Sequence, residues 1–283
     1  MAGFHGRASD IIVEIPDCRL LLPEVKEGAE VAARLAELGA SRKGALAVTV
    51  TQSTEGLDVS ALGGKPLDGP LRQGLAAACD RMGLARLAWD GEVVAMRTPP
   101  AQRFGKGLVV PPPGAFLQAT QHGEAALLAA LREAVAGART IVELFAGCAT
   151  FTLPLAEDAA VHAVEGDAEM IAALDLGWRR AQGLKPLTTE ARDLFRRPLD
   201  AQELARADAI ALDPPRAGAE AQVAEIARSP VARIGYVSCN PVTFARDAAV
   251  LTGAGFALDW VQVVDQFRWS SHIELVACLS RPA

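Results

Sequence analysis

Apolar and polar residues change their spacing along the chain. Between residues 44 and 97, short apolar runs alternate with turn-forming residues, and Asp90-Gly91 predicts a tight hairpin turn between two strands. From about residue 115 onward, helical spacing alternates with short apolar runs. The predicted helices are 71–82, 123–135, 150–158, 168–182, 219–228 and 241–253, and the predicted strands are 44–51, 57–62, 85–89, 92–97, 107–110, 140–144, 161–164, 187–191, 207–212, 233–237, 257–264 and 273–279.

This order of elements predicts two domains. Residues 98–114 contain five prolines and three glycines, a composition typical of a domain boundary. We therefore predict a smaller mixed α/β domain over residues 1–105 and a Rossmann-like α/β domain over residues 106–283. Because the strand–helix alternation ends in two strands with no helix between them, the second domain is expected to form a mostly parallel sheet with an antiparallel edge strand.

Ligands of such sheets bind at the carboxyl ends of the strands. The small residues 146–149 follow the first strand, and the helix expected to begin near Thr150 presents free N–H groups there. Glu165 follows the second strand, where a carboxylate can accept hydrogen bonds from both ribose hydroxyls, and Asp193 follows the third, where it can meet an adenine amino group. A dinucleotide dehydrogenase shares this acidic residue, but GxGxxG is absent, which favours an adenosyl cofactor without a pyrophosphate.

Two later strand ends and the last strand carry residues suited to chemistry. Asp213 opens Asp-Pro-Pro-Arg, a stiff loop in which Arg216 replaces the aromatic residue of amino-methylating enzymes. Cys239 lies at a strand-to-helix junction, where the helix N-terminus is expected to lower the thiol pKa. Glu274 opens an apolar strand, where partial desolvation suits a general base. Each residue alone also fits a structural role: a turn, a packed thiol or a solvated acid.

Together these stretches resemble the bacterial RNA uracil-5-methyltransferase family, which has a class I methyltransferase fold. The combination of motifs is far more specific than any one motif and covers nearly all of residues 115–283. The matching stretches are FLQAT (116–120), VELFAGCATFTLPLA (142–156), VEGDAEM (164–170), LDPPRAG (212–218), SCNPVTFARD (238–247) and DQFRWSSHIELVACLSR (265–281).

The resemblance implies an S-adenosylmethionine-dependent enzyme that methylates carbon 5 of a uridine in RNA. It assigns Cys239 as the nucleophile that attacks carbon 6 and Glu274 as the base that removes the carbon-5 proton. Flipping the uridine out of its stack is expected as well. The domain of residues 1–105 is expected to contact the RNA. The residues expected to contact the cofactor are Gln118, Phe145, Thr150, Glu165, Asp193 and Asp213.

The chain departs from the family pattern in three places. Thr150 ends a GCAT loop that usually reads G-x-G-N, and QFRWSS (266–271) lacks the usual Phe-Pro-x-Thr. Cys18 matches one of the four cysteines that hold an iron-sulfur cluster in some members, but the other three and their N-terminal TRAM-type barrel have no match. We therefore expect neither a cluster nor another metal. Since cluster-type members act mostly on 23S rRNA, rRNA is favoured over the tRNA T-loop.

Charge and composition narrow the expectations further. Residues 1–105 carry 12 basic and 13 acidic residues, and residues 106–283 carry 16 and 21, so neither domain has the basic balance typical of RNA-binding proteins. Without an apolar secretory segment or an 18-residue apolar run, we expect a cytoplasmic monomer that binds RNA and no membrane. Two alternatives remain open: an RNA-binding relative without catalysis, and a methyltransferase acting on a base amine or a small molecule.

Overall fold

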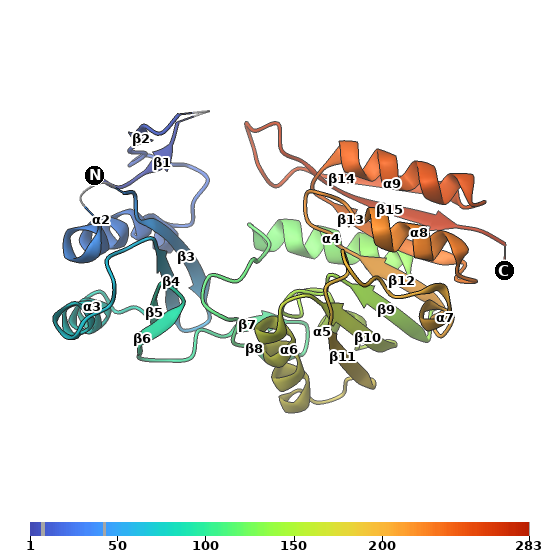
Figure 1. The fold of residues 1–283 in the computed structure, drawn as a ribbon, viewed down its shortest axis with the longest axis horizontal. Coiled ribbons are helices and arrows are strands. Elements are labelled where there is room, and N and C mark those ends of the chain that lie inside the picture. Colours follow the sequence, from blue (N-terminus) through green and yellow to red (C-terminus); the bar gives the residue numbers. More distant parts are fainter. Residues whose placement is uncertain (7–8, 42–43, 283) are drawn as a thin grey trace. The chain divides into compact units, whose positions relative to one another are not determined.

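The computed structural model describes residues 1–6, 9–41 and 44–282 and contains two compact units (Figure 1). The first unit comprises Met1–Gln102 and Val110–Ala115, and the second comprises Arg103–Val109 and Phe116–Ala283. The chain thus crosses between units more than once, unlike the single boundary expected after residue 105. The hairpin of β7 (Gln102–Phe104) and β8 (Gly107–Val109) explains this, because Phe104 and Val109 are buried in the core of the second unit.

The first unit contains a four-stranded sheet in the order β3-β4-β5-β6. The β4 and β5 strands are parallel, and the other two pairs are antiparallel. Two helices, α2 and α3, share one apolar core with this sheet. The elements are β1 (Phe4–His5), β2 (Ile12–Val13), α1 (Pro23–Lys26), α2 (Gly28–Gly39), β3 (Ala47–Ser53), β4 (Gly56–Leu62), α3 (Gly69–Arg81), β5 (Arg86–Trp89) and β6 (Glu92–Met96).

The Trp89 indole forms the centre of this core. It is 1% exposed, and its Nε1 donates a hydrogen bond to the Lys65 carbonyl at 2.9 Å. Gly39 and Gly64 lie so close to the ring that an added Cβ would be 2.5 and 2.0 Å from its carbons. Only glycine therefore fits beside the indole at these two positions. The next residues, Asp90 and Gly91, have φ values of 47° and 86°, as the predicted tight hairpin turn requires.

The second unit contains a seven-stranded sheet in the order β11-β10-β9-β12-β13-β15-β14. The first five strands are parallel, and β15 pairs antiparallel with both β13 and β14. The fold class predicted from the sequence is confirmed, although the antiparallel strand lies one place in from the edge. The strands are β9 (Thr140–Leu144), β10 (Ala160–Glu165), β11 (Leu187–Ala191), β12 (Ala209–Leu212), β13 (Arg233–Ser238), β14 (Ala257–Val264) and β15 (Glu274–Ser280).

Helices cover both faces of this sheet, so that the unit has three layers (Figure 1). Alternate side chains of β12 enter different cores, since Ala211 packs on one face and Leu212 on the other. One face carries α4 (Gln121–Ala134), α5 (Thr152–Leu155) and α6 (Ala168–Arg180), and the other carries α7 (Ala201–Leu204), α8 (Glu220–Arg228) and α9 (Pro241–Gly253). Among the described residues, no helix combines the length and apolar character needed to cross a membrane.

One predicted helix is shorter in the structure, and helices α1, α2 and α7 were not predicted. The helix expected over 150–158 is the single turn α5, because left-handed backbone at Gly147 and Ala149 delays the entry into the helix. Helix α2 was not predicted, although Val31 and Leu35 form a buried stripe at helical spacing.

The contact between Gly64 and Trp89 can be tested by overpacking. Gly64→Ala would force a methyl group against the rigid indole, and we expect the free energy of unfolding to fall by about 1–3 kcal/mol. Urea unfolding followed by tryptophan fluorescence measures this change. Gly69→Ala is the matched control, because no described atom lies within 4 Å of its added Cβ. Equal unfolding midpoints for the two variants would contradict the close packing of Trp89.

Candidate active site

The loop after β9 has an unusual backbone. Phe145, Gly147 and Ala149 have φ values of 62°, 58° and 102°, in the left-handed region that only glycine readily adopts. The turn directs the Gly147 N–H toward Glu165, whose Oε2 accepts it at 3.0 Å. An added Cβ at Gly147 would meet no described atom within 4 Å, so the loop backbone is open to a ligand here. Thr150, another predicted cofactor contact, lies partly buried in the same turn.

Backbone N–H groups fix the two acidic residues expected to bind a nucleoside. The second oxygen of Glu165 accepts from Gly166 and Asp167 at 2.7 and 3.1 Å. Asp193 accepts from Phe195 and Arg196 at 3.0 and 3.2 Å and remains exposed. A carboxylate has about four lone-pair sites, so each side chain keeps acceptor capacity for a ligand.

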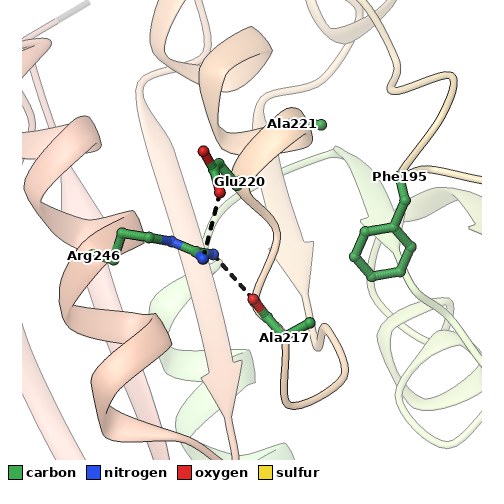
Figure 2. Close-up of a pocket in the computed structure, with 6 residues that line it drawn as sticks. Phe195, Ala217, Glu220, Ala221 and Arg246 are labelled. Atoms are coloured by element: carbon green, nitrogen blue, oxygen red, sulfur yellow. Dashed lines mark hydrogen bonds and ion pairs between the residues drawn. The ribbon is translucent and has the colours of Figure 1, made fainter.

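An apolar pocket of about 470 Å³ lies near these strand ends (Figure 2). Phe195 lines it and also packs against Phe145, with ring centroids 5.5 Å apart. In Figure 2 Arg246 lies across the loop from Phe195, donates to the Ala217 carbonyl at 3.1 Å and pairs with Glu220 at 3.5 Å. Arg246 also donates to the buried Asp247 carboxylate at 2.8 Å, so its charge is balanced within the chain.

Desolvated carboxyl groups gather at the same edge of the sheet. Burial raises the pKa of Glu143 in β9 to about 8, and the nearby charges of Asp213 and Glu165 add to the effect. Burial and the charge of Glu274 raise the pKa of Asp213 to about 7. An edge of this kind favours a cationic ligand, because a positive charge stabilises the ionised carboxylates. It suits a sulfonium cofactor better than a pyrophosphate.

Gln118 connects this edge to the loop between β14 and β15. Its Oε1 accepts a hydrogen bond from Gln266 Nε2 at 3.1 Å. The Gln266 Oε1 lies 3.3 Å from the Thr120 hydroxyl at the start of α4. Gln266 also interacts with Glu274 and partly offsets the rise in the pKa of Glu274 that burial causes. The predicted cofactor contact and the predicted base therefore share one neighbour.

Strand pairing brings Cys239 and Glu274 together. Ser238, the last residue of β13, pairs with Leu275 of the antiparallel β15. Each of the two predicted catalytic residues is one step beyond this pair, so they lie opposite each other. Cys239 is partly buried with a free thiol, and Glu274 is 6% exposed.

The thiol pKa differs from the sequence-based expectation. We predicted that the N-terminus of α9 would lower it, but the pKa of Cys239 is raised, first by burial and then by Glu274 and Asp213. Arg216 opposes these effects with its positive charge. The expectation was wrong because desolvation and two carboxylates outweigh the helix.

The loop that carries Arg216 is fastened to α9. Asn240 Nδ2 and the Thr243 hydroxyl donate to the Arg216 carbonyl at 2.9 and 3.2 Å. The Asp247 carboxylate, which is 1% exposed, accepts from the Ala219 N–H at 2.7 Å and from the Tyr236 hydroxyl at 2.6 Å. Asp247 therefore joins the loop after β12, helix α9 and strand β13 that leads to the thiol.

Sequence reasoning did not identify several residues of this site. Glu143, Gln266 and Asp247 received no role, although a buried acid inside an apolar strand or on an apolar helix face was a usable signal. Arg216 was used only to argue against an amine target. The Nδ1 of His272 lies 2.9 Å from Arg216 Nη2.

Cys18 belongs to the first unit and is partly buried with a free thiol. Across the described residues, no group of three or more His, Cys, Asp and Glu side chains is placed to hold a metal ion. Cys18 alone therefore does not fit an iron-sulfur cluster.

The chain is similar in sequence to known RNA methyltransferases. Residues 113–282 match the family model described as tRNA (uracil-5-)-methyltransferase. An RNA methyltransferase of Rhizobium meliloti is 44% identical over 281 residues, which are 99% of this chain and 68% of that protein. The RlmD protein of Chromohalobacter salexigens, named 23S rRNA (uracil(1939)-C(5))-methyltransferase, is 32% identical over 99% of this chain and 61% of its own length.

A solved structure shares the fold. The Pyrococcus abyssi tRNA (uracil-54, C5)-methyltransferase in complex with S-adenosyl-L-homocysteine matches with a TM-score of 0.77 and 22% identity. The match covers 95% of this chain and 69% of that one.

The raised thiol pKa can be measured by alkylation. We expect iodoacetamide to modify Cys239 with a midpoint above the ordinary thiol pKa of about 8.5. Glu274→Gln removes a negative neighbour and should lower the midpoint, whereas Arg216→Gln should raise it. Peptide mass spectrometry follows the modification as a function of pH. Cys18 is an internal control with the opposite shift, because backbone hydrogen bonds from Leu20 and Leu21 lower its pKa. An unchanged midpoint in Glu274→Gln would contradict the proximity of the two groups.

The role of Asp247 can be tested through stability. Asp247→Ala leaves the buried Tyr236 hydroxyl and Ala219 N–H without their acceptor, so we expect the free energy of unfolding to fall by about 2–4 kcal/mol. Glu220→Ala removes the other, exposed partner of Arg246 and should cost less than about 1 kcal/mol. Urea unfolding compares the two variants, and equal losses would contradict the special position of Asp247.

Proposed function

The chain belongs to the tRNA (uracil-5-)-methyltransferase family. We propose that it methylates carbon 5 of a uridine, with Cys239 as the nucleophile and Glu274 as the base. The chain is an S-adenosylmethionine-dependent RNA methyltransferase, and the family expected from the sequence is confirmed. The observation that carries the proposal is the β13–β15 register, which sets the thiol opposite the carboxylate.

The chemistry of uracil requires both side chains. Carbon 5 is too weak a nucleophile to take a methyl group unaided. The Cys239 thiolate adds to carbon 6, the electrons of the 5,6 double bond form an enolate, and carbon 5 becomes nucleophilic. When bound, S-adenosylmethionine supplies an electrophilic methyl group. Glu274 then accepts the carbon-5 proton, the double bond re-forms, and the bond between Sγ and carbon 6 breaks.

Arg216 favours the reactive form of the thiol. Burial and two carboxylates raise the pKa of Cys239, and the charge of Arg216, together with a backbone hydrogen bond, opposes them. The raised pKa of Glu274 matches its proposed task, because a base with a pKa closer to the working pH holds the abstracted proton better.

The residues at the strand ends fit S-adenosylmethionine. The open backbone at Gly147 leaves room for a ligand, and the carboxyl groups of Glu143 and Asp213 suit its positive charge. We assign Glu165 to the ribose and Asp193 to the adenine amino group. The remaining proposed contacts are Gln118, Phe145, Thr150 and Asp213.

Ribosomal RNA is the substrate we favour over the tRNA T-loop. Two observations support it: the chain is similar to an RlmD protein, and Cys18 matches a cysteine of the cluster-bearing branch. A role of residues 1–105 in contacting the RNA stays a prediction.

A covalent trap tests the proposed chemistry. Fluorine at carbon 5 cannot leave as a proton does, so a hairpin containing 5-fluorouridine should accumulate a methylated adduct on Cys239 in the presence of S-adenosylmethionine. Mass spectrometry locates the adduct, and Cys239→Ala should form none. With ordinary uridine, Glu274→Gln should accumulate the same kind of adduct, because the base is missing.

Paired hairpins from 23S rRNA and from the tRNA T-loop distinguish the two substrates. Binding of S-adenosylmethionine without an adduct on either RNA would favour an RNA-binding relative that lacks catalysis. Full activity of Cys239→Ala would instead indicate a different acceptor and a mechanism without the thiol.

A further inference from the structure

Trp269 is the most exposed large hydrophobic side chain of the second unit among the described residues, at 83%. It lies in the segment between β14 and β15 and has a φ of 65°. Single exposed apolar residues are common on protein surfaces, so exposure alone assigns no role. The position of the loop relative to the catalytic residues is the stronger observation.

Three contacts hold this loop against the active site. Val264 pairs with Glu274, which closes the base of the loop beside the catalytic carboxylate. Gln266 donates to Gln118, and His272 contacts Arg216 at 2.9 Å. Since Trp269 is five residues from Glu274, its Cα lies at most ~17 Å from that of the base. Trp269 therefore lies within reach of the nucleotides next to the reacting uridine.

Two cations accompany the indole. Arg268 is its immediate neighbour, and Arg216 contacts the far end of the same loop. Both arginines are exposed, and neither forms a salt bridge with the part of the chain that the structure describes. Eleven of the nineteen other described arginines have a carboxylate partner, so the distinct feature of this loop is an unpaired arginine placed directly beside an exposed indole.

An exposed indole next to an arginine without a carboxylate partner matches the chemistry of single-stranded RNA. Unstacked bases bind aromatic faces, and arginines bind the phosphates between them. We propose that Trp269 stacks on an RNA base adjacent to the target uridine while Arg268 contacts a neighbouring phosphate. This contact holds the uridine out of its own stack and in reach of Cys239. The inference rests on the proposed function, because it requires a uridine at the thiol.

The loop sequence QFRWSS (266–271) lacks the Phe-Pro-x-Thr motif usual in the family. The proposed contact of Trp269 is therefore not part of that motif. Stacking on Trp269 also requires that the RNA segment be looped or unpaired, since a base inside a duplex cannot stack on a protein side chain.

Substitution of Trp269 tests the stacking contact. Trp269→Ala should weaken binding of the RNA hairpin about 5- to 150-fold, which corresponds to the usual range for a base stacked on an aromatic residue. Trp269→Phe should restore most of the affinity. Binding of S-adenosylmethionine, measured by calorimetry, should not change in either variant. Leu176→Ala is the matched control, because it removes an exposed apolar side chain of α6, 46% exposed, outside this loop.

Fluorescence and salt dependence supply direct readouts. The wild-type protein should lose tryptophan emission when the hairpin binds, and Trp269→Phe should lose most of that signal while still binding. Arg268→Gln should reduce the slope of log affinity against log salt by about 1, as expected for one phosphate contact.

The outcomes separate the two proposals. If the wild type forms the 5-fluorouridine adduct and Trp269→Ala binds and reacts with RNA as well as Leu176→Ala does, the stacking inference is overturned. If RNA binding quenches the tryptophan emission of the wild type but no adduct forms, the catalytic proposal is contradicted, whereas the stacking of Trp269 on RNA is supported. Undiminished RNA binding by Trp269→Ala together with loss of a protein partner would assign the indole to a protein interface instead.

Discussion

The pairing of β13 with β15 determines where the reactive side chains lie. The two strands are separated by α9 and β14 in the sequence, yet β15 inserts between β13 and β14 and runs against both. A slip of one residue in this register would turn Glu274 to the other face of the sheet. The apolar side chains of β15 prevent such a slip, because Val276 and Ala277 pack into different cores. Core packing thus positions the catalytic pair.

Charge at the strand ends follows from the same arrangement. Parallel strands end at one edge, so Glu143, Glu165 and Asp213 come together, and β15 adds Glu274 to the group. Burial makes ionisation of several neighbouring carboxyl groups costly. Binding of a cationic ligand and ionisation of the carboxyl groups are therefore linked, and each favours the other. The positive charge of the cofactor would balance the carboxylates at this edge of the sheet.

Elements that depend on neighbouring residues could be predicted from the sequence, whereas contacts between distant residues could not. The Asp90-Gly91 turn and the alternation after residue 115 are local signals, and the structure contains both. Burial and then Glu274 raise the thiol pKa, and both result from tertiary packing, so reasoning from the adjacent helix gave the wrong direction. The role of Asp247 was not predicted for the same reason, because its partners Tyr236 and Ala219 lie 11 and 28 residues away in the sequence. Long-range contacts decide the electrostatics, whereas local patterns decide the elements.

The acidic composition is compatible with an RNA substrate once burial is considered. The formal charge of −6 treats every carboxyl group as ionised. Burial raises the pKa of Glu143 to about 8 and that of Asp213 to about 7, so both carboxyl groups hold protons more strongly than exposed ones do. The catalytic edge is therefore less negative than the residue count suggests. Arg216 stands beside it with an exposed guanidinium, so the potential that a phosphate meets there depends on this local balance and not on the sum over the chain.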